Sequence, residues 1–168
     1  LFISLALDSS FARYYFYEKT ISKKRIKILF STLFWFILIW GCFITIISLI
    51  VSPNLLKPIL DIPYFPYIPL TIIPVLLSQL TSLGSIYLRS SLKTRIFAAI
   101  NLISFVCSIS VVLILLIPYD FGIRANLYGG FFGALVSITL YTIFAIKNSL
   151  LGFYFEIRIL KKSLLYSL

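Results

Sequence analysis

The sequence contains no histidine and no methionine, and only five of its 168 residues are acidic. Without histidine, the chain has no Ser-His-Asp triad and no Cys/His metal site of its own. Its two cysteines, Cys42 and Cys107, lie inside apolar runs, which is typical of small buried hydrophobic residues. We therefore predict no enzymatic activity and no cofactor. Because methionine is absent, we also expect residue 1 to lie inside a longer natural protein.

Charge is scarce and apolar residues are abundant. The chain is 61% hydrophobic and 12% charged, whereas soluble domains are roughly 45–50% apolar and about 25% charged. This composition predicts that lipid surrounds most of the chain. The net charge of +10 does not indicate a nucleic-acid partner, because the basic residues lie between apolar runs and do not line one element.

Four long apolar runs predict membrane-spanning helices, namely Ile28–Val51, Leu70–Leu88, Ile96–Ile117 and Leu127–Ile146. Each is long enough to cross a hydrocarbon layer of about 30 Å with some tilt. A shorter run, Leu1–Phe11, predicts the end of a further helix whose beginning is missing. The predicted fold class is therefore all-α, a polytopic transmembrane helical bundle.

The connections between these runs alternate in charge. In chain order they carry six, one, three, one and four Lys or Arg residues. Under the positive-inside rule, the rich connections face the cytoplasm. We therefore predict that residues 13–27, 89–95 and 147–162 are cytoplasmic.

The connection Ser52–Pro69 is rich in proline, and Pro74 follows it. Proline lacks an N–H donor and disfavours helix in the residue before it. We therefore predict an extended connection, with helix starting near Leu70 and Pro74 either within the first turn or at a kink.

Small and polar residues recur at helical spacing within the predicted spans, which predicts inward faces. The carboxamides of Gln79 and Asn101 have two open interpretations, because each can bond a neighbouring helix or line a polar cavity. No charged side chain lies deep in a complete span, and Asp8 is the one carboxylate near the membrane interior. The stripes are Thr71, Val75, Ser78, Ser82, Ser85 and Arg89; Ala98, Asn101, Ser104 and Ser108; Gly129, Gly133 and Ser137, with Gly130 and Ala134 alongside; and Gly41, Thr45, Ser48 and Ser52.

Four ordered segments resemble polysaccharide flippases of the multidrug/oligosaccharidyl-lipid/polysaccharide exporter superfamily, whose O-antigen members are called Wzx-type. Leu7–Glu18 is similar to the end of the second helix in that family, and Ile86–Arg95 to the basic turn between the fourth and fifth. Phe121–Leu135 resembles the glycine-rich entry to the sixth helix, and Phe155–Leu168 the linker into the seventh.

This resemblance implies two pseudo-symmetric, MATE-like lobes that work by alternating access. Residues 1–148 would form most of the N-terminal lobe, from the end of helix two to helix six. Residues 149–168 would form a cytoplasmic amphipathic linker, because their apolar and basic residues recur on separate helical faces.

The implied function is flipping of an undecaprenyl-diphosphate-linked oligosaccharide across the bacterial inner membrane for polysaccharide export. Membrane lipid and that substrate would be the partners, together with polysaccharide assembly proteins. Arg13 and Arg89 would attract the diphosphate, although both also suit ordinary positive-inside anchors. Gln79, Asn101 and Ser82 would line the headgroup path. A drug or metabolite exporter, a membrane glycan polymerase or ligase, and a structural subunit are the alternatives.

Overall fold

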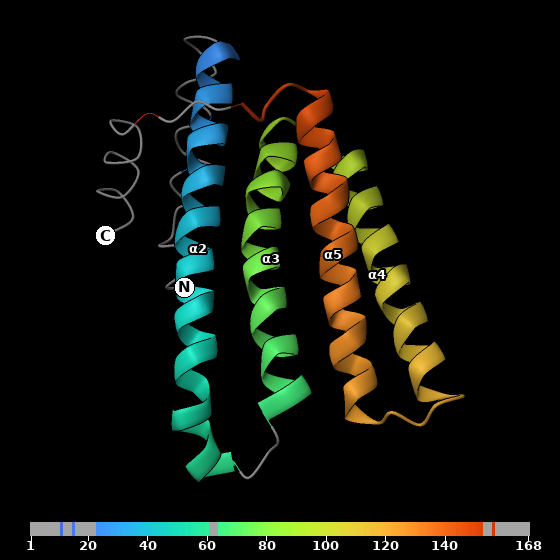
Figure 1. The fold of residues 1–168 in the computed structure, drawn as a ribbon. Helices are drawn as coiled ribbons and strands as arrows, with labels where there is room; N and C mark the ends of the chain where they lie inside the picture. Colours follow the sequence, from blue (N-terminus) through green and yellow to red (C-terminus); the bar gives the residue numbers. More distant parts are fainter. Residues whose placement is uncertain (1–10, 12–14, 16–22, 61–63, 153–155, 157–168) are drawn as a thin grey trace.

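The computed structural model describes residues 11, 15, 23–60, 64–152 and 156. Its helices are α2 (Lys23–Leu60), α3 (Tyr64–Ser90), α4 (Thr94–Leu116) and α5 (Ile123–Lys147) (Figure 1). All four are long and apolar enough to cross a membrane, and no strand occurs in these ranges. The prediction of an all-α transmembrane bundle is confirmed.

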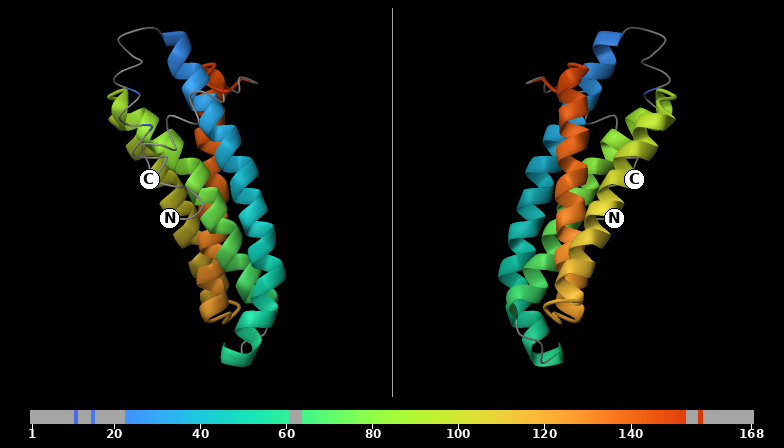
Figure 2. Two further views of the ribbon diagram at one scale, coloured as in Figure 1. Left: turned by 90° about the vertical axis from the view of Figure 1, so that its left-hand side faces the viewer. Right: turned by 90° about the vertical axis from the view of Figure 1, so that its right-hand side faces the viewer.

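The helices run alternately up and down, as Figures 1 and 2 show. Helix α2 packs on α3, α3 on α5, and α5 on α4, so that α5 lies between two helices that are consecutive in sequence. We call the end where α2 and α4 begin and α3 and α5 end the basic end. It carries Arg25, Lys27, Arg89, Lys93 and Lys147.

The proline-rich connection differs from the prediction. Helix α2 continues past Ser52 to Leu60, and α3 already begins at Tyr64, so the extended connection over Ser52–Pro69 is wrong. Within α3, Phe65 has extended dihedral angles, φ −98° and ψ 134°.

A tertiary contact explains why α2 tolerates Pro53. A proline at this position removes the N–H that would bond the carbonyl of Leu49, four residues earlier. The hydroxyl of Tyr64 donates to that carbonyl at 2.8 Å, and the hydroxyl of Ser52 donates at 3.4 Å. The start of α3 thus supplies the donor that the proline lacks.

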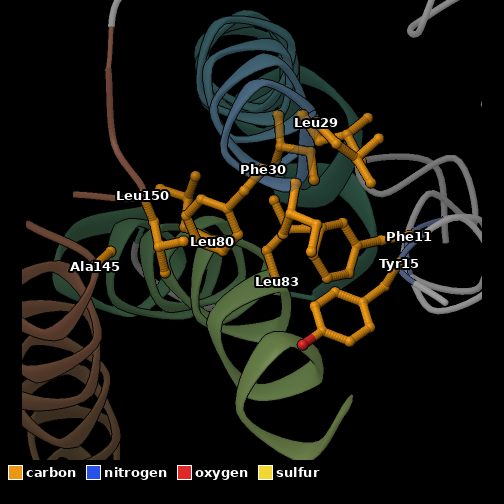
Figure 3. Packing of buried hydrophobic residues seen from close by; sticks show 11 residues of the cluster. Phe11, Tyr15, Leu29, Phe30, Leu80, Leu83, Ala145 and Leu150 are labelled. Carbon is orange, nitrogen blue, oxygen red and sulfur yellow. The ribbon is translucent and has the colours of Figure 1, made fainter. Parts of the chain in front are cut away.

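A side-chain core lies at the basic end, where α2, α3 and α5 meet (Figure 3). Leu33 and Leu83 are fully buried in it. Aromatic rings add to the packing, since the ring of Tyr87 lies 5.8 Å from that of Tyr15 and 5.8 Å from that of Phe30, both edge-on. The α2–α3 contact is therefore built from large side chains.

The α4–α5 contact is built from small residues instead. A Cβ atom added to Gly129 would lie 2.2 Å from Cγ2 of Val112, and one added to Gly133 would lie 2.9 Å from Cβ of Ser108. The hydroxyl of Ser108 donates to the carbonyl of Gly129 at 2.9 Å. The predicted close approach is confirmed at Gly129 and Gly133, whereas Gly130 beside them faces open space.

The faces predicted on α2 and α4 have different outcomes. On α2, Gly41, Thr45 and Ser52 are buried, which confirms an inward face. On α4, Ser104 is buried, but Asn101 lies one turn nearer the basic end and is exposed.

The segment after α5 docks onto α2. The carbonyl of Gly152 accepts hydrogen bonds from the hydroxyl of Ser31 and from Nε1 of Trp35, the latter at 3.1 Å. The N–H of Gly152 donates back to Ser31 at 3.3 Å, and the N–H of Glu156 donates to the hydroxyl of Thr32 at 3.2 Å. Ser31 and Thr32 are completely buried. Most of the amphipathic linker predicted over residues 149–168 lies outside the described residues, as does Asp8.

Candidate functional site

The predicted polar stripe on α3 is largely turned away from the core. Thr71, Ser78 and Arg89 are exposed, while Ser82 and Ser85 are half-buried. The hydroxyls of Ser78 and Ser82 donate to carbonyls of their own helix at 2.7 and 2.8 Å. A hydroxyl bonded in this way keeps oxygen lone pairs that can accept further hydrogen bonds. The stripe therefore forms an outward face that offers hydroxyl acceptors, with the apolar Val75 also exposed between Thr71 and Ser78.

Three helices meet in a polar junction, which we define as Ser85 of α3, Asn101 of α4 and Tyr141 of α5. The hydroxyl of Ser85 donates to the hydroxyl oxygen of Tyr141 at 3.0 Å. Nδ2 of Asn101 approaches the same oxygen at 3.5 Å and donates to the carbonyl of Phe97 at 2.9 Å. The junction joins α3 to α4 through a side chain of the helix between them.

The tyrosine ring is held by close packing. Tyr141 is only 4% exposed, and a Cβ atom added to Gly84 would lie 2.6 Å from its Cδ1. A buried phenol needs polar partners for its hydroxyl, and the junction supplies them. The position of the phenol oxygen is thus set by the backbone of α3 at Gly84.

Arg89 lies next to the junction at the basic end. Its guanidinium carbon is 5.5 Å from the centroid of the Phe97 ring, a cation–π distance. Because Ser85 and Arg89 are one turn apart on α3, and Asn101 and Phe97 one turn apart on α4, a cation and a ring stand beside a hydroxyl and an amide. The pairing combines a charged anion-binding group with neutral hydrogen-bonding groups.

A second cation closes the turn between α3 and α4. Nζ of Lys93 lies 5.3 Å from the centroid of the Phe144 ring and 3.4 Å from Oδ1 of Asn148. These contacts hold the turn against the end of α5. We therefore assign Lys93 a structural role and not a role in binding cargo.

The predicted site residues have different positions. Arg89 lies over the ring of Phe97, and Asn101 bonds the backbone carbonyl of the same residue. Gln79 is half-buried and lies farther along α3 towards the opposite end, with its backbone carbonyl bonded to Ser82. Arg13 lies outside the described residues.

Tyr141 was missed by sequence reasoning. The usable signal is a phenol inside the apolar run Leu127–Ile146, because a tyrosine buried there requires a partner for its hydroxyl. Its partners on α3 and α4 could not be named from local sequence, since they depend on which helices neighbour α5. Among the described residues, no group of three His, Cys, Asp or Glu is placed to hold a metal ion.

Four antiparallel helices of membrane length, with many large apolar side chains exposed on their outer surfaces, define a multi-pass integral membrane protein of the helical-bundle class. A family model described as polysaccharide biosynthesis protein matches residues 1–168, and the chain belongs to that family. No curated protein and no solved structure matches the chain. The chain thus has a membrane-embedded role connected with polysaccharide biosynthesis.

Proposed function

We propose that the chain forms part of a transporter that flips an undecaprenyl-diphosphate-linked oligosaccharide across the bacterial inner membrane. The observation that carries the proposal is the exposed polar face of α3, which continues through the polar junction to Arg89. Membership of a polysaccharide biosynthesis family supports a glycan as the cargo. In this proposal, Arg89 binds the diphosphate, while Ser82, Gln79 and Asn101 contact the glycan.

The contrast between two exposed faces supports this reading. On α4, most outward residues are apolar, and Leu102, Phe105 and Ile114 are each more than half exposed, as lipid contact requires. Beyond its first turn, the polar outward residues of α4 are Asn101 and Ser110. The outward face of α3 instead carries hydroxyls at Thr71 and Ser78. Polar groups in a membrane helix are costly against hydrocarbon and suit a face that meets water or a polar cargo.

The chemistry of the cargo matches the groups available. A guanidinium is a donor with a fixed positive charge, which suits a diphosphate. Sugar hydroxyls both donate and accept, so the hydroxyl and amide oxygens along α3 and α4 provide acceptors for them. Moving a lipid headgroup between leaflets breaks no covalent bond, which agrees with a transporter and not an enzyme.

The basic end is the cytoplasmic side in this proposal, with residues 13–27, 89–95 and 147–162 facing the cytoplasm. The cargo then reaches Arg89 from the inner leaflet, with Arg13 as a further diphosphate contact. Residues 1–148 belong to the N-terminal lobe of a two-lobe transporter, and residues 149–168 form the linker that follows it. Polysaccharide assembly proteins that use the flipped lipid are the expected partners.

The test is a leaflet-transfer assay of the full-length protein in proteoliposomes that contain a lipid-linked oligosaccharide. We expect Arg89→Gln to slow transfer by about tenfold, which corresponds to about 1.4 kcal/mol in the barrier. Arg95→Gln is the matched control, because Arg95 is an exposed cation at the same end, and it should change the rate by less than about twofold. Failure of the wild-type protein to move any lipid-linked glycan contradicts the proposal, and transport of a drug-like cation instead favours an exporter.

A further inference from the structure

We propose that Asn101, oriented by Tyr141, is a specificity residue that accepts a hydrogen bond from the glycan, either from a sugar hydroxyl or from the N–H of an acetamido group. The inference deepens the proposed function and rests on it. It assigns to Tyr141 the role of a positioning residue, because its buried hydroxyl acts on the cargo only through Asn101.

The orientation of the Asn101 amide follows from its neighbours. A carboxamide has two N–H hydrogens on its nitrogen and an oxygen that only accepts. The carbonyl of Phe97 lies 2.9 Å from Nδ2 and cannot donate, so nitrogen must face it. The hydroxyl oxygen of Tyr141, at 3.5 Å, lies near enough to receive the second N–H. Both N–H groups are thus used, Asn101 is exposed, and Oδ1 accepts no hydrogen bond from any described residue, so we infer that Oδ1 is the atom available to an outside donor.

The position of Asn101 along α4 indicates what surrounds its amide oxygen. Asn101 lies seven residues after the first residue of α4, Thr94, which is about 10 Å along a helix that rises about 1.5 Å per residue. An exposed amide oxygen at this depth costs free energy if it faces hydrocarbon. It is satisfied when a donor from water or from a polar cargo reaches it. The oxygen therefore marks a place where polar groups enter.

Tyr141 holds this arrangement from behind. Its ring is packed against Gly84, and its hydroxyl oxygen also accepts a hydrogen bond from the hydroxyl of Ser85 at 3.0 Å. If the phenol oxygen were removed, the carbonyl of Phe97 would still hold Nδ2 of Asn101, but the second N–H would lose its acceptor, and the amide would be held at one point instead of two. The direction of Oδ1 would then be less tightly defined, which weakens the hydrogen bond that it can accept.

Arg89 and Asn101 bind different parts of the cargo, the phosphate and the sugar respectively. Arginine only donates, so it suits phosphate oxygens, which only accept. The outward Oδ1 of Asn101 only accepts, so it disfavours phosphate and selects donors. Phe97, whose ring is covered by Arg89, is one turn from Asn101 on α4. That offset is about 6 Å along the axis, comparable to the span of one sugar ring, and it places a sugar next to a bound phosphate.

The experiment compares the affinities of the full-length protein for two lipids, undecaprenyl diphosphate without sugar and the same lipid bearing its oligosaccharide. We expect Asn101→Leu and Tyr141→Phe each to weaken binding of the glycan-bearing lipid by about five- to tenfold, the value of about one hydrogen bond. Binding of the sugar-free lipid should change by less than twofold. Arg89→Gln should weaken both lipids. Ser110→Ala, which removes an exposed hydroxyl bonded to its own helix, should change neither.

The double variant Asn101→Leu with Tyr141→Phe tests whether Tyr141 acts through Asn101 or weakens binding independently of it. If Tyr141 acts through Asn101, adding Tyr141→Phe to Asn101→Leu produces no further loss, whereas independent effects add. Asn101 is exposed, so its variant tests the proposal even if Tyr141→Phe lowers stability. Equal losses for both lipids, or additive losses, overturn this inference while the proposed function stands. A wild-type protein that binds neither lipid overturns the proposed function as well.

Discussion

The α2–α3 and α4–α5 contacts hold pairs of similar membrane helices together by opposite means. Between α2 and α3, large side chains such as Phe30, Leu33 and Leu83 fill the space. Between α4 and α5, Gly129 and Gly133 let the backbones approach. Inside a membrane, lipid tails are as apolar as a leucine side chain, so close packing and hydrogen bonds contribute more than burial from water. The two contacts should therefore fail under opposite kinds of substitution.

The largest effect is expected at the small-residue contact. Gly129→Leu would place Cβ 2.2 Å from a methyl group of Val112 and 2.9 Å from the carbonyl oxygen of Ser108. Because the second atom belongs to the backbone, α4 and α5 must separate, at a cost of about 3 kcal/mol or more. Thermal unfolding of the purified protein in detergent measures this.

Gly130→Leu is the matched control for that substitution. It adds the same side chain one residue away, where nothing lies within 4 Å of the new Cβ atom. We expect a change in stability of less than about 1 kcal/mol, because leucine also favours helix over glycine. Equal destabilisation by the two leucines would show that the close approach at Gly129 is wrong.

The large-side-chain contact should respond to the reverse change. Leu83→Ala removes a fully buried side chain and leaves a cavity between α2 and α3, which should cost about 2–3 kcal/mol. Leu113→Ala on α4 truncates a leucine that is 48% exposed, and it should cost less than about 1 kcal/mol. Unfolding in detergent again provides the measurement, and similar losses at both leucines would contradict the core position of Leu83.

The smallest effect is expected at the end of the bundle opposite the basic end, where the start of α3 contacts α2. Tyr64→Phe removes the hydroxyl that bonds the Leu49 carbonyl left open by Pro53. We expect a loss of about 1 kcal/mol, with amide exchange faster around residue 53 than in the wild type. The double variant Tyr64→Phe with Pro53→Ala should recover stability, because alanine restores the backbone donor. A loss that persists in that background would mean that the hydroxyl acts elsewhere.

The sequence predicts best those features that depend on spacing along one helix. The small residues at Gly129 and Gly133 are four apart, so their shared face followed from helical periodicity alone. The spans predicted at Ile96–Ile117 and Leu127–Ile146 agree with α4 and α5 to within a few residues, because each apolar run is bounded by polar or turn-forming residues.

Features that depend on a second helix could not be predicted in this way. Pro53 continues in α2 because Tyr64 replaces its missing donor, and that tertiary contact overrides the local tendency of proline to end a helix. Tyr141 became a candidate only when α5 was found between α3 and α4. Of the two interpretations of Asn101, the bond to a neighbouring helix is observed, because Nδ2 lies 3.5 Å from the hydroxyl oxygen of Tyr141; the polar path stays a prediction.

The docked segment after α5 also has a mechanical consequence. Gly152 is tied through both its N–H and its carbonyl to α2, although α5 itself packs on α3 and α4. The segment thus crosses the end of α3 and connects α5 to α2 (Figure 1). Its hydrogen bonds therefore couple the end of α5 to α2, in addition to the packing of α5 on α3 and α4.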